Sequence, residues 1–206
     1  MDNLRQKYED KFNIQFPEVG INKSWEYLIN YEPTRNKDQL IPYERYNYSI
    51  SQLYGHVLDI GSADGYGAYL MSKNPKIKTI TCIEIQDLAI EKAKKNLKGI
   101  ENVTIIKGIG EDIPFKEPFD SIHCGATLEH VFDDRKVLSE IKRLLKGIAI
   151  ICVPIAWGTD KLVHIREYKS EKEFMNLLGE YFEVIKYKTY TRKDRRITTV
   201  VTVKNK

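Results

Sequence analysis

The chain has 206 residues, of which 42% are hydrophobic and 30% are charged. This mixture fits one globular domain with a full core, and it excludes a disordered chain and a disulfide-stapled miniprotein. The net charge of +4 is too small to indicate nucleic-acid binding by itself. No apolar run approaches the roughly 20 residues of a membrane helix, and the first residues include acids that a signal peptide lacks, so we expect a cytoplasmic protein.

The first 42 residues are expected to form an N-terminal helical segment or lid, followed by the main domain at 43–206. Within that segment, Asn3–Phe12 and Lys23–Ile29 have the length of short helices. The stretch Asn30–Pro42 carries prolines and other turn formers, so it is expected to link the segment to the domain.

Short β-rich apolar runs alternate with helical-period segments from residue 56 onward. This alternation is typical of repeated βαβ units with a parallel sheet. The expected strands are Val57–Ile60, Thr79–Ile85, Val103–Lys107, Ser121–Cys124 and Ile148–Pro154. Helices are expected after Asp87 and after Asp133-Asp134, and Lys146 and Gly147 should close the second of these.

The last part of the chain predicts a helix and two strands. Ser170 and Glu173 form a capping-box pattern that opens the helix, and Gly179 is expected to end it. Phe182–Tyr190 and Ile197–Val203 should form an antiparallel hairpin, because their link is too short for a parallel crossover. Four of the five residues at 192–196 are basic; a solvated turn is the default interpretation, and phosphate contact is the alternative.

Cysteine and acidic clusters give no metal or redox signal. Cys82, Cys124 and Cys152 stand far apart in apolar stretches and are expected to be buried reduced thiols. No metal site is expected, because the Asp133-Asp134 pair at a helix start stabilises the helix dipole without an ion.

The strongest local signal is the glycine-containing turn between the first expected strand and the helix that follows. Gly61 and Gly65 allow the backbone to approach a ligand where a Cβ would intrude. A dinucleotide site would want a glycine in place of Ala63. Asp59 and Asp64 also place negative charge where a phosphate would lie, so the turn favours a cationic or zwitterionic ligand.

Glu84 ends the second expected strand. A carboxylate at this position can accept hydrogen bonds from both hydroxyls of a ribose, although a solvated strand-end acid is the alternative. The joint spacing of Gly61 and Glu84 favours a nucleoside site.

These motifs resemble those of the class I S-adenosylmethionine-dependent methyltransferases, from about Arg45 to the end of the chain. The segment Asp59–Gly65 is similar to their first motif, and Glu84 to their ribose-binding acid. The segment Gly108–Phe115 is similar to their adenine-side loop. Phe119–Ile122 is similar to their fourth strand, and Thr127–Val131 to the Leu-Glu-His segment of the group often called type 11.

The resemblance implies an α/β fold, with a Rossmann-like doubly wound sheet of seven strands. The sheet would be mostly parallel with a C-terminal antiparallel hairpin, in the strand order 3-2-1-4-5-7-6. The implied cofactor is S-adenosylmethionine, with S-adenosylhomocysteine as the product. The implied cofactor-binding residues are Asp59, Gly61, Ser62, Ala63, Asp64, Gly65, Glu84, Ile85, Gly110, Glu111, Asp112, Gly125 and Ala126.

Two positions depart from the family pattern. Ala63 stands where the first motif usually has glycine, and the small side chain is compatible with the turn. Ile109 stands where the adenine loop usually has an aspartate, so contact with the adenine amino group would have to come from Glu111, Asp112 or backbone.

Such a cofactor carries the reactivity, so the protein must align the acceptor and, for a hydroxyl, supply a base. His130 after the fourth strand is the first candidate for the base, and His164 after the fifth is the second. His56 and His123 are assigned to structure. By resemblance to family members from sugar and glycan pathways, the expected substrate-binding residues are Tyr46, Trp157, His164 and Arg166.

The leading hypothesis is methyl transfer to an oxygen or nitrogen of a small-molecule or saccharide acceptor. One alternative is an RNA or protein methyltransferase that uses the basic hairpin, and another is a cofactor-binding module without catalysis. A nicotinamide-dependent oxidoreductase is disfavoured by Ala63 and by the terminal hairpin. We expect neither nucleic acid nor a membrane as a partner, and the protein is expected to be a monomer or a homodimer.

Overall fold

The computed structural model describes residues 37–158, 164–191 and 197–206, with side chains from residue 44 onward. The predicted helices Asn3–Phe12 and Lys23–Ile29 and the basic link 192–196 lie outside the described residues.

The described residues form one seven-stranded sheet with helices before and between the strands. The strands are β1 (Gly55–Ile60), β2 (Ile77–Glu84), β3 (Val103–Lys107), β4 (Phe119–Gly125), β5 (Leu145–Ile155), β6 (Phe182–Thr191) and β7 (Ile197–Asn205). The helices are α3 (Lys37–Ile50), α4 (Tyr66–Ser72), α5 (Asp87–Asn96), α6 (Asp134–Leu144) and α7 (Glu171–Tyr181), with the short 3-10 helix η1 (Leu128–His130) before α6.

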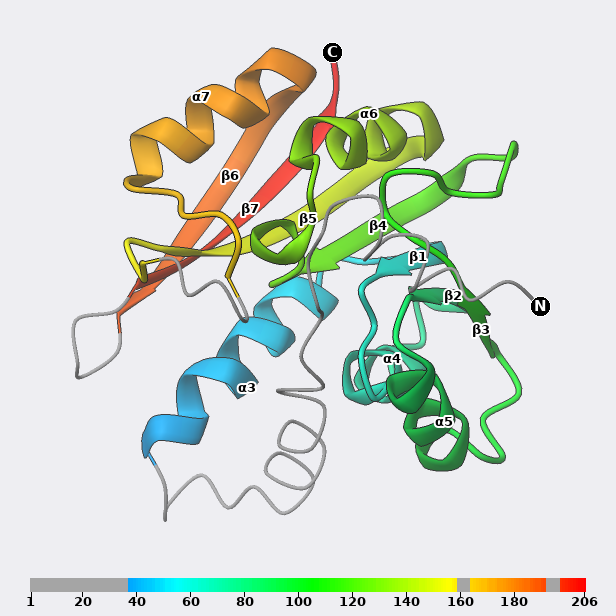
Figure 1. Cartoon of the computed structure of the whole chain (residues 1–206). Coiled ribbons are helices and arrows are strands. Elements are labelled where there is room, and N and C mark those ends of the chain that lie inside the picture. Colours follow the sequence, from blue (N-terminus) through cyan, green and yellow to red (C-terminus); the bar gives the residue numbers. More distant parts are fainter. Residues whose placement is uncertain (1–36, 159–163, 192–196) are drawn as a thin grey trace.

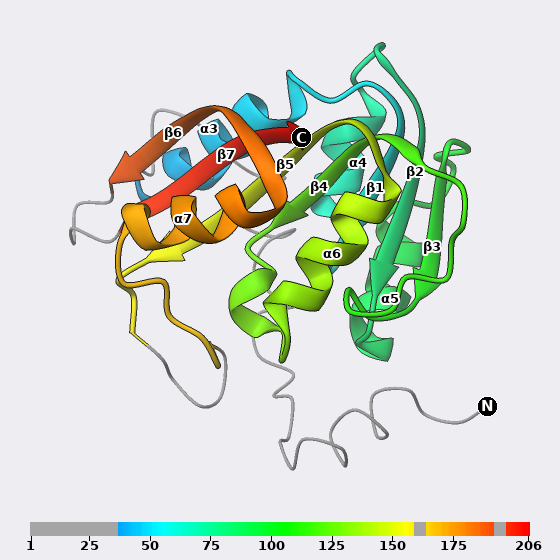
Figure 2. The same ribbon diagram turned by 90° about the horizontal axis from the view of Figure 1, so that it is seen from above.

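The strand order is β3-β2-β1-β4-β5-β7-β6, which confirms the predicted fold (Figure 2). Neighbours from β3 to β5 are parallel, whereas β7 is antiparallel to both β5 and β6. Because the five parallel strands run in one direction, their carboxyl ends lie along a single edge of the sheet.

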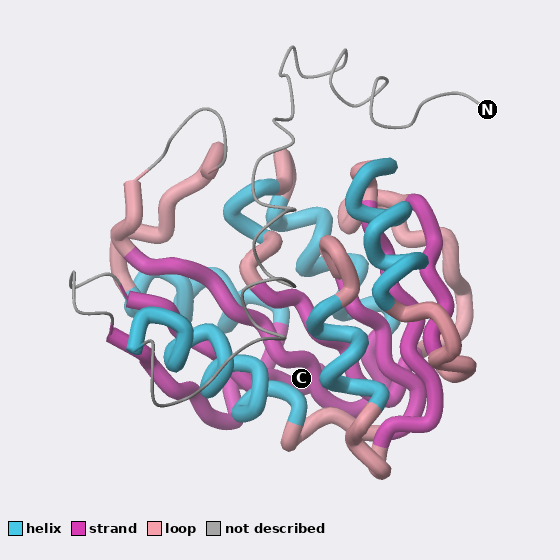
Figure 3. Tube along the Cα trace, turned by 90° about the horizontal axis from the view of Figure 1, so that it is seen from below, coloured by secondary structure: helices cyan, strands magenta, loops and turns pink. Residues whose placement is uncertain are grey.

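Helices cover both faces of the sheet. In Figure 1, α3, α4 and α5 lie on one side and α6 and α7 on the other, and Figure 3 shows the strands between these layers. The two faces hold separate cores: Leu58 belongs to the cluster that contains Leu138 and Phe174, whereas Val57 belongs to the cluster that contains Met71. Successive side chains of a strand point to opposite faces, which is why the central strands are apolar almost throughout.

Two helix starts follow the predicted caps. The Asp133 carboxylate accepts a hydrogen bond from the Lys136 backbone N–H at 3.0 Å and caps α6. The Ser170 hydroxyl accepts one from the Glu173 N–H at 3.1 Å and caps α7. The Glu173 carboxylate in turn accepts from the Lys169 N–H at 2.9 Å, which completes a variant of the capping box.

The predicted end of α6 is wrong. The helix ends at Leu144 and β5 begins at the next residue, so Lys146 and Gly147 lie in a strand. A Cβ on Gly147 would lie 2.1 Å from the Tyr54 hydroxyl and 2.5 Å from the Asp120 carbonyl oxygen. This glycine therefore permits a close approach within the sheet and does not terminate the helix.

Two other expected boundaries also differ. Helix α7 continues through Gly179 to Tyr181, and Gly179 is not among the described glycines with positive φ. Residues 37–42 belong to α3 and are not a linker, so this helix crosses the expected boundary between residues 42 and 43. The role of residues 1–42 as a separate segment or lid stays a prediction.

The three cysteines are free and buried, as predicted. Within the described ranges, no helix combines the length and the apolar character that crossing a membrane requires.

Candidate active site

Residues with a strained backbone lie at the carboxyl edge of the parallel strands. In the described part of the chain, three residues other than glycine have positive φ: Ala63 at 47°, Ala126 at 55° and Ala156 at 56°. They follow β1, β4 and β5, respectively. Strained backbone of this kind is kept at sites where it serves a function, and ligands of doubly wound sheets bind at this edge.

The turn from β1 into α4 has no room for a side chain at Gly61 or Gly65. Gly61 and Gly65 have φ values of 73° and 86°, which disfavour any residue with a side chain. A Cβ on Gly61 would lie 2.4 Å from the Thr127 hydroxyl oxygen, and this hydroxyl donates a hydrogen bond to the Ile60 carbonyl at 3.0 Å. The segment after β4 thus packs directly on the glycine turn.

Glu84 is held by backbone N–H groups at the end of β2. The Ala63 N–H donates to Oε2 at 2.9 Å, and the N–H groups of Ile85 and Gln86 each donate to Oε1 at 2.9 Å. Burial raises the pKa of Glu84, while these three hydrogen bonds favour its charged form. The result is a fixed acceptor beside the glycine turn, where the hydroxyls of a ribose would be bound.

Asp59 is paired with His123, a contact that the sequence interpretation missed. The Asp59 carboxylate lies 2.7 Å from His123 Nδ1, and both side chains are buried. Gly125 makes room for the imidazole, because a Cβ there would lie 2.6 Å from the ring. The two residues are register partners on β1 and β4, so the strand alignment contained the signal for this pair.

Asp64 and Ser62 are built into the turn. The Asp64 carboxylate lies 3.4 Å from the Tyr66 N–H at the start of α4, and its backbone carbonyl accepts a hydrogen bond from the Asn96 side chain at 2.9 Å. The Ser62 N–H donates to the Ile83 carbonyl at 3.2 Å. Both side chains are buried, so these residues shape the turn from within.

The loop after β3 is anchored through Glu111. Its carboxylate accepts hydrogen bonds from the backbone N–H groups of Phe132 at 3.1 Å and Asp133 at 3.4 Å. Gly110 is buried in the same loop, whereas Asp112 is exposed. Of the two acidic candidates for the adenine amino group, Asp112 is therefore the more accessible.

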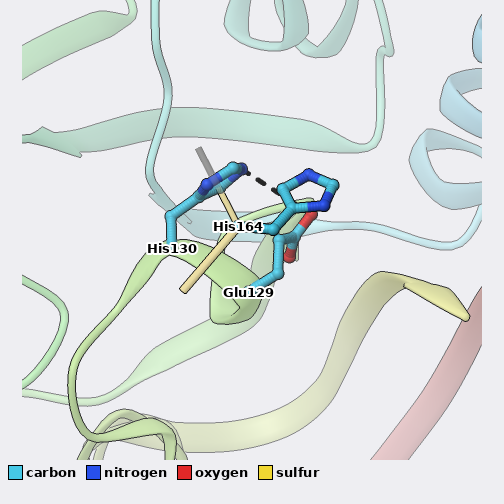
Figure 4. A group of neighbouring side chains, drawn as sticks. All are labelled: Glu129, His130 and His164. Atoms are coloured by element: carbon cyan, nitrogen blue, oxygen red, sulfur yellow. Dashed lines mark ion pairs between the residues drawn. The ribbon is translucent and has the colours of Figure 1, made fainter. Parts of the chain in front are cut away.

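A second cluster lies on η1 and on the segment that precedes α7. Glu129, His130 and His164 each place one nitrogen or carboxylate oxygen so that the three atoms lie within 4.8 Å of one another (Figure 4). His130 Nε2 is 3.8 Å from Glu129 Oε1, and the two imidazole centroids are 5.1 Å apart. The two predicted histidines are thus brought together.

Glu129 is a functional candidate that the sequence interpretation did not select, although it stands next to His130. The residue is only 1% exposed, and its Oε2 atom has no hydrogen-bond partner. Burial raises the pKa of Glu129 to about 7, because it outweighs the opposing effects of the residue's own N–H, His164 and Arg45.

Arg166 stabilises the second cluster through contacts with the residues that follow η1. Its guanidinium donates to the carbonyls of Val131 at 2.8 Å and Phe132 at 2.9 Å, and its Nε lies 3.1 Å from an Asp134 carboxylate oxygen. Arg166 was predicted to bind the substrate, but these guanidinium N–H groups are directed at other residues of the protein.

The two aromatic candidates lie in different places. The Trp157 ring is centred 6.0 Å from that of His164, and its indole N–H donates to the Ile197 carbonyl at 2.7 Å. Tyr46 lies on the cofactor side, with its ring centroid 6.2 Å from that of His123 and 5.5 Å from that of Tyr66.

Comparisons with known proteins agree with this geometry. The solved structure of the N-methyltransferase NodS from Bradyrhizobium japonicum, in complex with S-adenosyl-L-homocysteine, superposes with a TM-score of 0.69. The superposition covers 99% of both chains at 16% sequence identity, which shows a common fold.

Two curated relatives match part of the chain. An uncharacterized methyltransferase of Bacillus subtilis (strain 168), YcgJ, is 34% identical over 93 residues, which are 44% of this chain and 36% of that protein. A protein-L-isoaspartate O-methyltransferase of Fervidobacterium nodosum is 37% identical over 103 residues, which are 47% of this chain and 49% of that protein. The matched regions thus span between a third and a half of these relatives.

A family model described as a methyltransferase domain matches residues 54–199, which is most of the chain and includes the glycine turn, Glu84 and the second cluster. The chain therefore belongs to this methyltransferase-domain family and, within it, to the class I enzymes that use S-adenosylmethionine.

Proposed function

We propose that the protein transfers a methyl group from S-adenosylmethionine to an oxygen or nitrogen of a small-molecule or saccharide acceptor in the cytoplasm. The observation that carries the proposal is the direct contact between the glycine turn and the segment after β4. Thr127 packs against Gly61, and the next three residues form η1, which bears His130. A donor held at the turn would face an acceptor held beside the histidines.

The glycine turn after β1 and Glu84 at the end of β2 fit the cofactor. Glycine at positions 61 and 65 permits the left-handed backbone of the turn and its close packing on Thr127 and Leu97, and Glu84 presents a carboxylate fixed by three N–H donors. When bound, S-adenosylmethionine supplies a methyl group activated by its sulfonium. The chain has to orient that donor, align the acceptor and exclude water.

His130 is the proposed base for a hydroxyl acceptor. Its side chain is 34% exposed, whereas the neighbouring Glu129 is buried, so the imidazole is accessible to an acceptor. A well-placed base contributes about 10²–10⁴-fold to the rate of such a transfer. An amine acceptor depends less on this residue when it arrives uncharged.

Trp157 and His164 support an acceptor of small size. Their rings lie close together beside His130, and flat indole and imidazole rings suit a compact ligand that carries both apolar and polar groups. Tyr46 would complete the site from the cofactor side, and Arg166 would act by positioning η1.

A protein acceptor is the second candidate, because one relative is named as a protein-L-isoaspartate O-methyltransferase. Its match covers less than half of this chain, so it gives weaker support than the side chains of the second cluster. The basic link that would serve an RNA acceptor lies outside the described residues.

Calorimetric titration with S-adenosylmethionine, S-adenosylhomocysteine and NAD tests the cofactor first. We expect micromolar binding of the first two and no binding of NAD. Absence of binding for all three would contradict the proposal and favour a module without catalysis.

Transfer of a labelled methyl group tests the acceptor. We expect label on saccharide or small-molecule hydroxyls or amines, and unchanged turnover in the double variant Arg195→Ala and Arg196→Ala. Labelling of protein or RNA instead, with a salt-dependent loss in the double variant for RNA, would overturn the proposed acceptor class.

A further inference from the structure

We propose that Glu129, His130 and His164 form a binding site for one divalent transition-metal ion, which receives and polarises the acceptor hydroxyl. The site itself stands on the geometry of these three residues, whereas its role toward the acceptor rests on the proposed function. The proposal replaces the expectation of a protein without a metal, which considered only the acidic pair at the start of α6.

The donor set indicates the class of metal. Two imidazoles and one carboxylate are typical ligands of zinc and of ferrous iron, whereas magnesium and calcium are usually bound by oxygen atoms alone. Three protein ligands also leave coordination positions open, as in catalytic zinc sites. An acceptor oxygen or a water molecule would occupy such a position.

The distances in the structure are compatible with this set. Ligand atoms that lie about 2.0–2.2 Å from an ion are about 3.3–3.6 Å apart in a tetrahedral site. The corresponding atoms here all lie within 4.8 Å of one another, and the pair formed by His130 and Glu129 is at 3.8 Å. Side-chain shifts of about 1 Å would therefore close the site around an ion.

The ligands are pre-organised by backbone contacts. The Glu129 carbonyl accepts hydrogen bonds from the N–H groups of Ile165 at 3.1 Å and Arg166 at 3.2 Å. These two bonds fix the segment that carries His164 against η1, which carries the other two ligands. The Arg166 guanidinium adds a second tie through the carbonyls after η1.

The buried carboxylate gives an independent reason for an ion. Glu129 is 1% exposed, and its Oε2 atom has no hydrogen-bond partner. A buried polar atom without a partner is costly, and a bound ion is one of the recognised ways to satisfy it. Figure 4 shows this carboxylate next to the His164 ring, and the dashed line marks its ion pair with His130.

The chemistry follows from the charge of the ion. A hydroxyl bound to a divalent ion loses its proton more easily, because the ion stabilises the oxygen anion. The O–H bond breaks, its electron pair stays on the acceptor oxygen and its proton passes to water. In this state His130 acts as a ligand, and the ion takes over the task that a histidine base would otherwise have.

Cobalt(II) is the probe for the site. The 206-residue chain is freed of metal with a chelator and titrated with Co²⁺, whose visible absorption reports nitrogen and oxygen ligands. We expect one ion per chain, displaced by Zn²⁺. No saturable spectral change in the wild-type protein would overturn the proposal.

Three variants and one control locate the ion. We expect Glu129→Gln, His130→Ala and His164→Ala each to weaken Co²⁺ binding by more than about 100-fold, beyond the roughly 10–100-fold that outer partners cost. His56→Ala is the control, because this exposed histidine contacts Thr79 on the neighbouring strand. Wild-type affinity in all three variants would overturn the proposal.

Two measurements separate folding and cofactor effects from metal binding. Binding of S-adenosylhomocysteine by the metal-site variants shows that they are folded, and Glu84→Ala should weaken this binding yet keep its Co²⁺ spectrum. If the wild-type protein binds Co²⁺ but no S-adenosylhomocysteine, the proposed function fails while the metal site stands. If chelation leaves methyl transfer unchanged in metal-free protein, the assigned role toward the acceptor is wrong.

Discussion

The two halves of the carboxyl edge treat their buried carboxylates differently. Glu84 lies in the half that we propose to bind the cofactor, which consists of the glycine turn and the end of β2 and is called the cofactor half. Both of its carboxylate oxygens accept hydrogen bonds, from three backbone donors in all. Glu129 lies in the half that we propose to hold the acceptor, which consists of η1 and the segment that carries His164 and is called the acceptor half. One of its carboxylate oxygens has no hydrogen-bond partner, and two imidazoles lie nearby. Backbone N–H groups thus hold the Glu84 carboxylate in place, whereas the Glu129 carboxylate has an oxygen atom that a bound ligand would contact.

Because of this difference, we expect the two halves to respond to different kinds of substitution. The cofactor half depends on backbone geometry, so a single added methyl group should disrupt it. The acceptor half depends on side chains that two segments bring together, so it should respond to the loss of individual functional groups while the fold persists.

The largest effect is expected for Gly61→Ala. The new methyl group would meet Thr127 at 2.4 Å, and the backbone φ of 73° adds about 1–2 kcal/mol of strain. We expect thermal unfolding at a lower temperature and loss of S-adenosylhomocysteine binding by more than about 100-fold, which corresponds to roughly 2.8 kcal/mol.

Gly99→Ala is the matched control for this variant. Gly99 has a φ of 86° but nothing within 4 Å of its added Cβ, so it isolates the strain of the backbone from the collision. It should lower stability without affecting cofactor binding. Equal loss of binding in both variants would show that the contact with Thr127 is irrelevant.

Glu84→Ala should have the next largest effect. The change removes a charged acceptor and leaves three partly buried N–H groups without it, so we expect cofactor affinity to fall by about 1.5–3 kcal/mol, or about 10- to 150-fold. Calorimetry with S-adenosylhomocysteine measures the loss, and Glu91→Ala on the exposed side of α5 is the control. Unchanged affinity would remove the ribose assignment of Glu84.

The cofactor half was the more predictable part of the molecule, because its motifs are contiguous in sequence. A strand, a glycine turn and a strand-end acid predicted the turn at Gly61 and the position of Glu84. Alternating apolar runs predicted the strands, and the family resemblance supplied their order. The pair formed by Asp59 and His123 was missed because it depends on the register between β1 and β4.

The acceptor half could be predicted only in part. His130 and His164 were selected as strand-end residues, but Glu129 joins them through hydrogen bonds from Ile165 and Arg166 that no local pattern shows. Non-local contacts likewise decided the end of α6, because Leu145 pairs with Phe119 and draws the following residues into the sheet.

Arg166→Ala should have a moderate effect that is confined to the acceptor half. The change removes the donors to Val131 and Phe132 and the ion pair with Asp134, so η1 loses its support. We expect Co²⁺ affinity to fall by about 10-fold, as for other outer partners of metal sites, with S-adenosylhomocysteine affinity unchanged.

Arg166→Lys sharpens this test. The lysine ammonium can form the ion pair with Asp134, but it cannot also donate to the carbonyls of Val131 and Phe132 as the planar guanidinium does. The lysine should therefore restore only part of the Co²⁺ affinity. Equal losses of cofactor and metal binding in Arg166→Ala would mean that the two halves are not separable.

The smallest effect is expected for Ala63→Gly. At a φ of 47° an alanine costs about 1–2 kcal/mol more than it does in an ordinary conformation, and glycine relieves this strain. The glycine also loses about 0.5–1 kcal/mol more conformational entropy on folding, so the net gain in stability should be about 1 kcal/mol or less. The Ala63 N–H would still donate to Glu84, so S-adenosylhomocysteine affinity should stay within about threefold of the wild-type value, which is roughly 0.7 kcal/mol. A larger loss of affinity would show that cofactor binding depends on the methyl group of Ala63 itself. The inference that the cofactor half depends on backbone geometry alone would then be wrong.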